Sequence, residues 1–159
     1  MIIKSERFTL RLLTEQCASR RYLSWFKDSK TKEFISYTSS SLSELKDYIA
    51  TKNADSTCLL LGIFAGDEHI GNIKYEPIDL VNKTATMGIL LGEIQWRGKG
   101  VAAEVISASA EFLVKSQGIE SILLGVDKGN FPALTAYKKL GFEISQQTDK
   151  GLLMKKSLL

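Results

Sequence analysis

The sequence has one histidine and two cysteines, too few for the metal sites or disulfide frameworks that stabilise many small domains. His69, Cys17 and Cys58 lie far apart and form no cluster with metal-ligand spacing, which argues against a structural zinc site. We expect Cys58, inside the run CLLLGIF, to be buried. Neither cysteine is expected to need a disulfide.

Long apolar runs are also missing. No run approaches the roughly 18 residues that cross a bilayer. The N-terminal residues include a charged side chain at Lys4, and they lack the apolar stretch and small-residue cleavage site of a secretory signal. We therefore expect a cytoplasmic protein that does not bind membranes. A formal net charge of +3 is too small to indicate nucleic-acid binding.

Internal repeats and Pro/Gly-rich linkers are absent as well. The 159 residues are the size of one ordinary domain, and an apolar content of 44% is typical of a globular protein. Such a chain can bury a continuous core without covalent cross-links. We predict a single domain over residues 1–159.

Hydrophobic periodicity predicts an α/β protein whose mixed (α+β) sheet is mainly antiparallel at first, with helices on both faces. The second half of the chain alternates strand and helix. The expected strands are 7–13, 58–64, 70–77, 84–93, 119–127, 142–148 and 152–158, and the expected helices are 16–28, 44–49, 101–117 and 130–140. The residues GDEH at 66–69 are expected to form a turn, which would place His69 at the surface.

The most informative segment is ILLGEIQWRGKGVAAEV, residues 89–105, in which a strand leads through glycines into a helix. The first N–H groups of a helix lack internal partners and its dipole is positive there, so this arrangement favours an anion. Gly98 and Gly100 let a phosphate approach the backbone closely. The segment therefore predicts a phosphate-binding loop.

Three kinds of phosphate-binding loop deserve comparison. A P-loop does not fit, because five residues rather than four separate Gly92 from Gly98, and Lys99 is followed by glycine instead of Ser or Thr. A dinucleotide fingerprint matches from Gly98 to Ala103, with Asp127 as the ribose carboxylate. However, the chain after Ala103 is too short to complete a doubly wound sheet. The third kind binds the pyrophosphate of coenzyme A.

This third kind is supported by resemblance to a known family. Residues 95–100, QWRGKG, match the Gln/Arg-x-x-Gly-x-Gly/Ala signature of the Gcn5-related N-acetyltransferase (GNAT) superfamily. The VAAE that follows is similar to the ribosomal-protein-alanine acetyltransferase-like branch. Residues 130–142, NFPALTAYKKLGF, resemble the second signature of the family, and ERFTLRLLT at 6–14 looks like its first strand. The resemblance covers nearly the whole chain.

The resemblance implies the GNAT fold, a mostly antiparallel sheet with a splayed parallel strand pair that holds the pantetheine arm. It implies an enzyme that moves acetyl from acetyl-coenzyme A, its co-substrate, to a primary amine by direct attack in a ternary complex, without a metal. Ile89, Leu90 and Leu91 would contact pantetheine and the thioester through their backbones. The backbone N–H groups expected to bind the pyrophosphate are those of Arg97, Gly98, Lys99, Gly100, Val101 and Ala102, with added charge from Arg97 and Lys99.

Tyr137 is the candidate general acid. An unperturbed phenol has a pKa near 10, so it carries a proton that a departing thiolate can take. Tyr137 lies two helical turns after Asn130, and both should face the same side. Asn130 can cap its helix and also hydrogen-bond the cofactor arm. A purely structural role for Tyr137 in the core is the alternative.

The general base is not evident. Many relatives carry a glutamate in the strand before the glycine loop, where this sequence has Thr86 and Met87. Glu76 is the candidate that we retain, with Glu93 and Asp127 as other nearby acids. A relayed water is an equal alternative. The missing glutamate also leaves open a non-catalytic domain that only binds an acyl-coenzyme A.

The acceptor is suggested by a basic and aromatic segment. Residues 16–32 contain a single acid, Asp28, and five bases, Arg20, Arg21, Lys27, Lys30 and Lys32. Trp25, Phe26 and Tyr37 supply aromatic faces. Cations suit phosphates, and aromatic faces suit sugars or bases, so we predict an anionic acceptor such as a nucleotide-linked amino sugar, or another small amine. A protein N-terminus, or charges that merely solvate a helix, are the alternatives.

Overall fold

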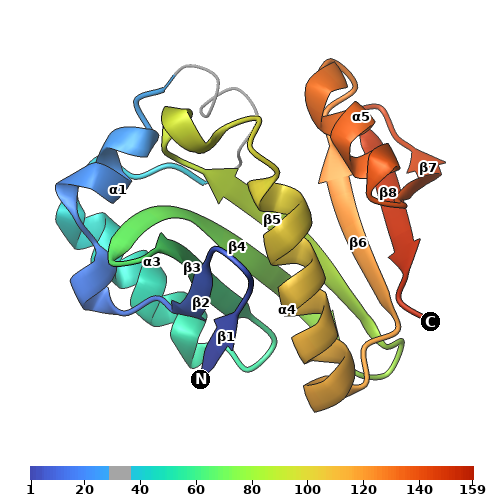
Figure 1. Ribbon diagram of the computed structural model, residues 1–159, viewed down its shortest axis with the longest axis horizontal. Coiled ribbons are helices and arrows are strands. Elements are labelled where there is room, and N and C mark those ends of the chain that lie inside the picture. The colour runs from blue at the N-terminus through green and yellow to red at the C-terminus, as the bar shows by residue number, and fades with distance from the viewer. Residues whose placement is uncertain (29–36) are drawn as a thin grey trace.

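The computed structural model describes residues 1–28 and 37–159. The strands in these residues form one eight-stranded sheet (Figure 1). The strands are β1 (Ile2–Lys4), β2 (Thr9–Leu12), β3 (Leu59–Ala65), β4 (Glu68–Asp79), β5 (Thr84–Leu91), β6 (Ser121–Val126), β7 (Glu143–Gln147) and β8 (Leu152–Ser157). Their spatial order is β1-β2-β3-β4-β5-β6-β8-β7. Among the described strands, β5 and β6 are the parallel pair, and the other neighbours are antiparallel.

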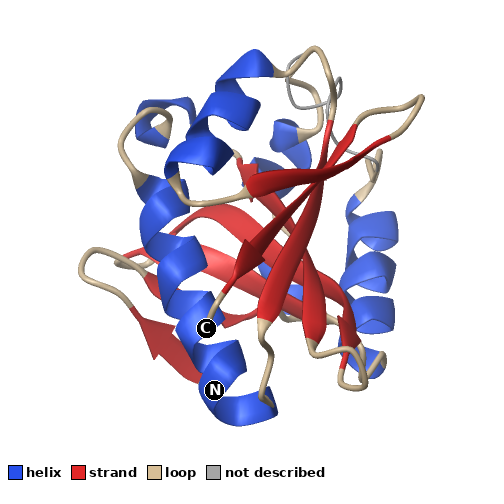
Figure 2. Cartoon of the chain, turned by 90° about the vertical axis from the view of Figure 1, so that its right-hand side faces the viewer, coloured by secondary structure: helices blue, strands red, loops and turns tan. Residues whose placement is uncertain are grey.

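Helices cover both faces of this sheet (Figure 2). They are α1 (Arg20–Trp25), α3 (Leu42–Ala54), α4 (Val101–Gln117) and α5 (Phe131–Lys139), with short 3-10 helices η1 (Glu15–Cys17) and η2 (Ile94–Trp96). One hydrophobic cluster joins α1 and α3 to Leu13 and Leu60. A larger cluster joins α4 to most of the strands, and α5 packs against it. The predicted mixed sheet with helices on both faces is confirmed.

Two elements illustrate why the sequence folds this way. In β3 every residue but the last is buried, as a continuous apolar run covered on both faces should be. In α4 the buried side chains recur at helical spacing and turn one stripe toward the sheet. They are Val101, Val105, Ile106, Ser109, Ala110 and Leu113. Because α4 begins directly after the glycine loop, this packing also fixes where the loop lies.

The N-terminal part differs most from the sequence-based prediction. The sequence did not indicate β1, which has only three residues and is held by its pairing with β2. The helix expected over 16–28 is shorter, because Ser19 caps α1 by accepting the N–H of Tyr22. The helix expected over 44–49 is longer, since α3 begins at Leu42 after Ser41 caps it by accepting the N–H of Glu44.

The expected surface turn at 66–69 is also shorter than predicted. β4 begins at Glu68, so His69 lies in a strand. Its ring stacks on Phe64 at 4.8 Å between centroids and meets the edge of Trp25 at the same distance. His69 is therefore packed in an aromatic cluster, and the prediction of a surface position was wrong.

None of the described helices is long and apolar enough to cross a membrane.

Candidate active site

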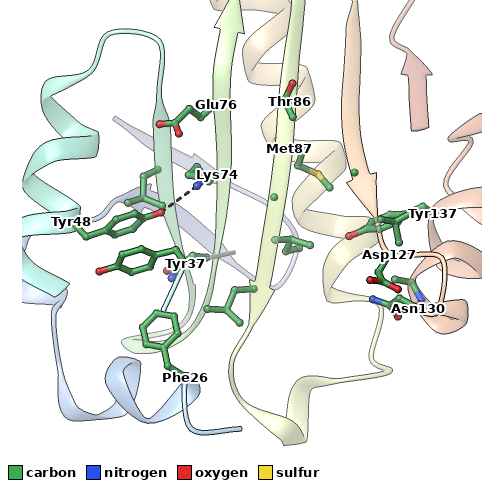
Figure 3. Close-up of a pocket in the computed structure, with 18 of the residues that line it drawn as sticks. Phe26, Tyr37, Tyr48, Lys74, Glu76, Thr86, Met87, Asp127, Asn130 and Tyr137 are labelled. Carbon is green, nitrogen blue, oxygen red and sulfur yellow. Dashed lines mark hydrogen bonds between the residues drawn. The ribbon is translucent and has the colours of Figure 1, made fainter. Parts of the chain in front are cut away.

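The two parallel strands separate after a short stretch of pairing. Residues 84–86 of β5 pair with residues 121–123 of β6, while β5 continues to Leu91 and β6 to Val126. A pocket of about 480 Å³ lies where they part, with lining residues from both strands (Figure 3). Pockets of this size hold small-molecule ligands. The splayed parallel pair expected from the family resemblance is therefore present.

The open edge of β5 faces this pocket. Ile89 pairs with Ile73 of β4 on one side, whereas beyond Thr86 no pairing with β6 occupies the other side. Ile89 and Leu90 line the pocket, as expected. Leu91 does not line it, and its carbonyl oxygen accepts hydrogen bonds from Nε and Nη2 of Arg97, each at 3.3 Å.

The glycine loop adopts the backbone shape that its residues permit. Gly98 and Gly100 have φ values of 71° and 78°, in the left-handed region that favours glycine. Gly100 is the N-cap of α4, so Val101 and Ala102 present the first helical N–H groups. A Cβ on Gly98 would contact nothing, which leaves the loop surface open. This arrangement can bind an anion.

Arg97 plays a different part from the one expected. Its backbone N–H donates to the carbonyl oxygen of Ile94 at 3.0 Å, so it is not free for a phosphate. Its guanidinium Nη2 lies 2.9 Å from Oδ2 of Asp28, just after α1. Arg97 thus ties the loop to Asp28 and Leu91, and the candidate anion cradle begins at Gly98. Lys99 is exposed beside it.

Tyr137 and Asn130 lie on the same wall of the pocket, as their spacing predicted (Figure 3). Tyr137 is partly buried, with its ring packed edge-on against Phe142 at 5.7 Å. Burial raises the pKa of Tyr137, so the phenol holds its proton at neutral pH. Asn130 caps α5 by accepting the N–H of Ala133 at 3.3 Å, and its amide group also faces the pocket.

The three acids considered as bases occupy different places. Glu76 and Asp127 line the pocket, but Glu93 does not. Glu93 instead accepts a hydrogen bond from Nε1 of Trp25 and makes an ion pair with Arg21.

Glu76 is held in an ion pair. Nζ of Lys52 lies 2.8 and 2.9 Å from its two oxygens. Burial alone would raise the pKa of Glu76, but hydrogen bonds from Lys52 and Cys58 outweigh that effect and lower it. A carboxylate with a lowered pKa is a weak base, so the geometry gives little support to the base role that we retained for Glu76.

The opposite wall of the pocket is aromatic and was only partly foreseen. Of the three aromatic residues in the acceptor hypothesis, Phe26 and Tyr37 line it and Trp25 does not. The other wall residues, which sequence reasoning missed, are Tyr22, Tyr48, Leu60, Asn72 and Lys74. One signal was available for the last two: alternate residues of a strand share a face, so Asn72, Lys74 and Glu76 project together from β4.

The described basic side chains of the 16–32 segment do not line this wall, although Tyr22 and Phe26 of the same segment do. Arg20, Arg21 and Lys27 are exposed and do not line the pocket, and Arg21 is paired with Glu68 and Glu93. Lys30 and Lys32 lie outside the described residues. The described part of the segment therefore does not support an anionic acceptor in the way that we expected.

Metal chemistry finds no support in the described part of the chain. None of its His, Cys, Asp and Glu residues form a group of three that could hold a metal ion. Cys17 and Cys58 are free thiols and only partly buried, so Cys58 is less enclosed than we expected.

Comparison with known proteins agrees with this geometry. A family model described as "Acetyltransferase (GNAT) domain" matches residues 7–143. An N-alpha-acetyltransferase of Saccharolobus solfataricus is 36% identical over 72 residues, which are 45% of this chain. The match spans 42% of that relative, less than half of its length.

Solved structures show the same fold over nearly the whole chain. The ribosomal L7/L12 alpha-N-protein acetyltransferase RimL, in complex with coenzyme A, has a TM-score of 0.87 and 16% identity, and the match covers 99% of this chain and 98% of RimL. A chimeric spermidine N-acetyltransferase, SpeG from Vibrio cholerae with hSSAT, has a TM-score of 0.83 and 18% identity, with 96% of each chain covered.

Proposed function

The chain belongs to the GNAT acetyltransferase family, and we propose that it moves acetyl from acetyl-coenzyme A to a primary amine within a ternary complex. The observation that carries the proposal is the separation of β5 and β6 beside the glycine loop. An extended pantetheine arm can pair with the open edge of β5 as an extra strand would. The diphosphate can then lie at the N-terminus of α4.

The described residues fit such a ligand. Backbone groups of Ile89 and Leu90 are available along the open strand edge, and neither needs a particular side chain for that role. N–H groups from Gly98 to Ala102 form the candidate cradle for the diphosphate. Asn130 adds an amide donor from the other wall.

The proposed chemistry needs one proton donor and one proton acceptor. The nitrogen lone pair of the neutral amine forms the new bond to the thioester carbonyl carbon, and the carbon–sulfur bond breaks. Tyr137 gives its phenolic proton to the sulfur. The amide nitrogen loses a proton to water, which returns one to Tyr137. We assign this transfer to water because Lys52 neutralises Glu76.

The proposed acceptor is a small-molecule amine, such as a nucleotide-linked amino sugar. The pocket of about 480 Å³ extends from the aromatic wall past β5 to β6 and α5. The proposed pantetheine arm occupies part of this volume, and the space that remains favours a compact acceptor. A protein N-terminus is the second candidate, because the Saccharolobus solfataricus relative is an N-alpha-acetyltransferase and RimL acts on a ribosomal protein.

A thiol-release assay tests the proposal. The protein is incubated with acetyl-coenzyme A and a library of small amines and peptides with free N-termini, and free coenzyme A is measured. Transfer in a ternary complex requires initial-rate lines that intersect when both substrates are varied. Calorimetry with acetyl-coenzyme A and with NAD supplies the control. Binding of acetyl-coenzyme A without thiol release from any amine would indicate a non-catalytic domain, and binding of NAD alone would refute the cofactor assignment.

A further inference from the structure

A row of three residues crosses the sheet next to the aromatic wall of the pocket, which is formed by Tyr22, Phe26, Tyr37 and Tyr48. Leu60 of β3 pairs with Lys74 of β4, and Lys74 pairs with Gly88 of β5. Directly opposite residues in antiparallel strands project their side chains to the same face. Gly88 has no side chain, and a Cβ built there would have no atom within 4 Å. The space beside Lys74 is therefore open on the β5 side, and all three residues line the pocket.

Lys74 has no acidic partner within this space. Its Nζ donates to the hydroxyl of Tyr48 at 3.2 Å (Figure 3), and no carboxylate of the described residues lies within ion-pair distance of it. Burial raises the pKa of Tyr48 to about 12, so that phenol stays neutral. Lys74 is thus a partly buried cation held by a neutral oxygen.

Two acids lie near Lys74 without reaching ion-pair distance, and the charge of Lys74 helps to lower the pKa of one of them, Glu76. Glu76 is the one acid on the same face of β4, and Lys52 already neutralises it at 2.8 Å. Asp127 lies across β5, beside Tyr137 and Asn130 (Figure 3). On the β4 side of the pocket, Lys74 and Glu76 together with Lys52, which lies behind Glu76 and does not line the pocket, leave one positive charge, and the balancing carboxylate of Asp127 lies on the other wall.

The aromatic wall shapes the rest of the space. Tyr37 and Tyr48 are stacked, with ring centroids 3.7 Å apart and planes 15° apart. Phe26 meets Tyr37 edge-on at 5.8 Å. Rings fixed in this way offer a flat surface to a ring or short chain. Lys74 lies beside the hydroxyl group of Tyr48, at the edge of that surface (Figure 3).

We propose that Lys74 binds an anionic group, a carboxylate or phosphate, on a small acceptor amine whose body lies over Gly88 and against the stacked tyrosines. This inference rests on the proposed acetyltransferase function and names the acceptor class and the residue that selects it. A lysine ammonium suits either anion as a point charge. A polyamine would bring a second cation beside Lys74, where no described carboxylate lies within ion-pair distance, and is disfavoured. Lys74 contacts the acceptor but takes no part in proton transfer.

Two matched pairs of amines test the proposal and separate the two anions. Glucosamine 6-phosphate and glucosamine differ by a phosphate, and tyrosine and tyramine differ by a carboxylate. For each pair we compare kcat/KM of the amine that carries the anionic group with kcat/KM of the amine that lacks it. The comparison is made in the wild-type protein, in Lys74→Met and in Lys74→Arg. Lys46→Met is the control, because Lys46 is an exposed lysine of α3 outside the pocket.

In the wild type, at least one anionic amine should be preferred. Lys74→Met should reduce that preference by about 10- to 100-fold, the range for loss of a hydrogen bond to a charged group. The loss should lie mainly in KM, and Lys74→Arg should retain much of the preference. Lys46→Met should match the wild type. The proposal would be overturned if the best acceptor were spermidine, an amine without an anionic group, or a peptide N-terminus. It would also be overturned if the preference for the anionic amine persisted in Lys74→Met.

A binding measurement keeps this outcome apart from failure of the proposed function. Glucosamine 6-phosphate and tyrosine are titrated into the complex of the protein with coenzyme A, so no turnover is needed. If no amine is acetylated, the acetyltransferase proposal fails, but this titration still decides whether Lys74 binds the anion. Equal affinity of Lys74→Met and the wild type for both ligands would refute the role of Lys74.

Discussion

The indole ring of Trp25 occupies the space where a side chain of Gly92 would lie. A Cβ on Gly92 would come within 2.0 Å of Cδ2 of the indole. Nε1 of Trp25 also donates to Glu93 at 2.9 Å. Through these contacts α1 is fixed to the end of β5, directly before the segment that leads into the glycine loop.

Gly92→Ala should therefore destabilise the protein. The added methyl group must displace the indole or the backbone, and overpacking of this kind costs roughly 1–3 kcal/mol. Denaturant unfolding measures the loss. Gly88→Ala is the matched control, four residues earlier within β5, because a Cβ there meets nothing. Equal stability of both variants would show that Trp25 moves aside without cost.

Gly98→Val and Gly100→Val should weaken coenzyme A binding by at least about tenfold, roughly 1.4 kcal/mol. A branched side chain disfavours the left-handed φ at both positions and crowds the candidate diphosphate cradle. Calorimetry gives the affinity. Gly118→Val is the control, because Gly118 has a φ of 67° at the other end of α4 and should lose stability without losing affinity. Unchanged affinity in folded loop variants would end the assignment.

Tyr137→Phe should lower kcat by about 10²-fold or more, since it keeps the ring and removes the proton of the proposed acid. Coenzyme A affinity should barely change, because no cofactor contact is assigned to the hydroxyl. Steady-state kinetics and calorimetry on the same preparation separate the two effects. Full activity in the variant would leave Tyr137 with only its packing against Phe142.

Glu76→Gln distinguishes a carboxylate base from water. Because Lys52 neutralises Glu76 and lowers its pKa, we expect kcat to fall less than about tenfold, below the 10²- to 10⁴-fold typical of a general base. Circular dichroism should show that the variant folds despite the lost ion pair. A drop of about 10²-fold or more would establish Glu76 as the base and remove our assignment to water.

Stability should fall as the pH drops below the ordinary histidine pKa of about 6.5. Burial lowers the pKa of His69, so below 6.5 the unfolded chain binds a proton that the native state resists. The free energy of unfolding then declines by up to roughly 1.4 kcal/mol for each pH unit down to the native pKa. His69 is the only histidine, so the slope between pH 6.5 and the carboxylate range is attributable to it.

The control for this slope is His69→Gln. Its amide can still donate to Asn72, whose Oδ1 lies 2.7 Å from Nε2 of the histidine, but it does not titrate. Urea unfolding at pH 7.5 and 5.5 should show a smaller difference for the variant than for the wild type. An identical difference in both proteins would mean that another group is responsible.

Local sequence patterns were enough to predict most of the secondary structure. The apolar run of β3, the helical stripe of α4 and the glycines around it each follow from short-range sterics and burial. Sequence patterns failed where only tertiary contacts decide. The three residues of β1 carry no periodic signal. His69 is enclosed by the rings of Tyr22 and Trp25, which lie more than 40 residues earlier in the chain, and by Phe64, its partner across the β3–β4 turn.

The candidate site divides in the same way. The sequence by itself determined the glycine loop and the position of Asn130 and Tyr137 on the same side of α5, because backbone φ preferences and helical spacing are local properties. Only the tertiary structure decided which charges meet in the pocket. In the folded protein Glu76 pairs with Lys52, and Lys74 lies beside Gly88 with no described carboxylate within ion-pair distance. Arg21 lies outside the pocket. Electrostatic balance depends on distances between side chains of different elements, and sequence spacing does not encode those distances.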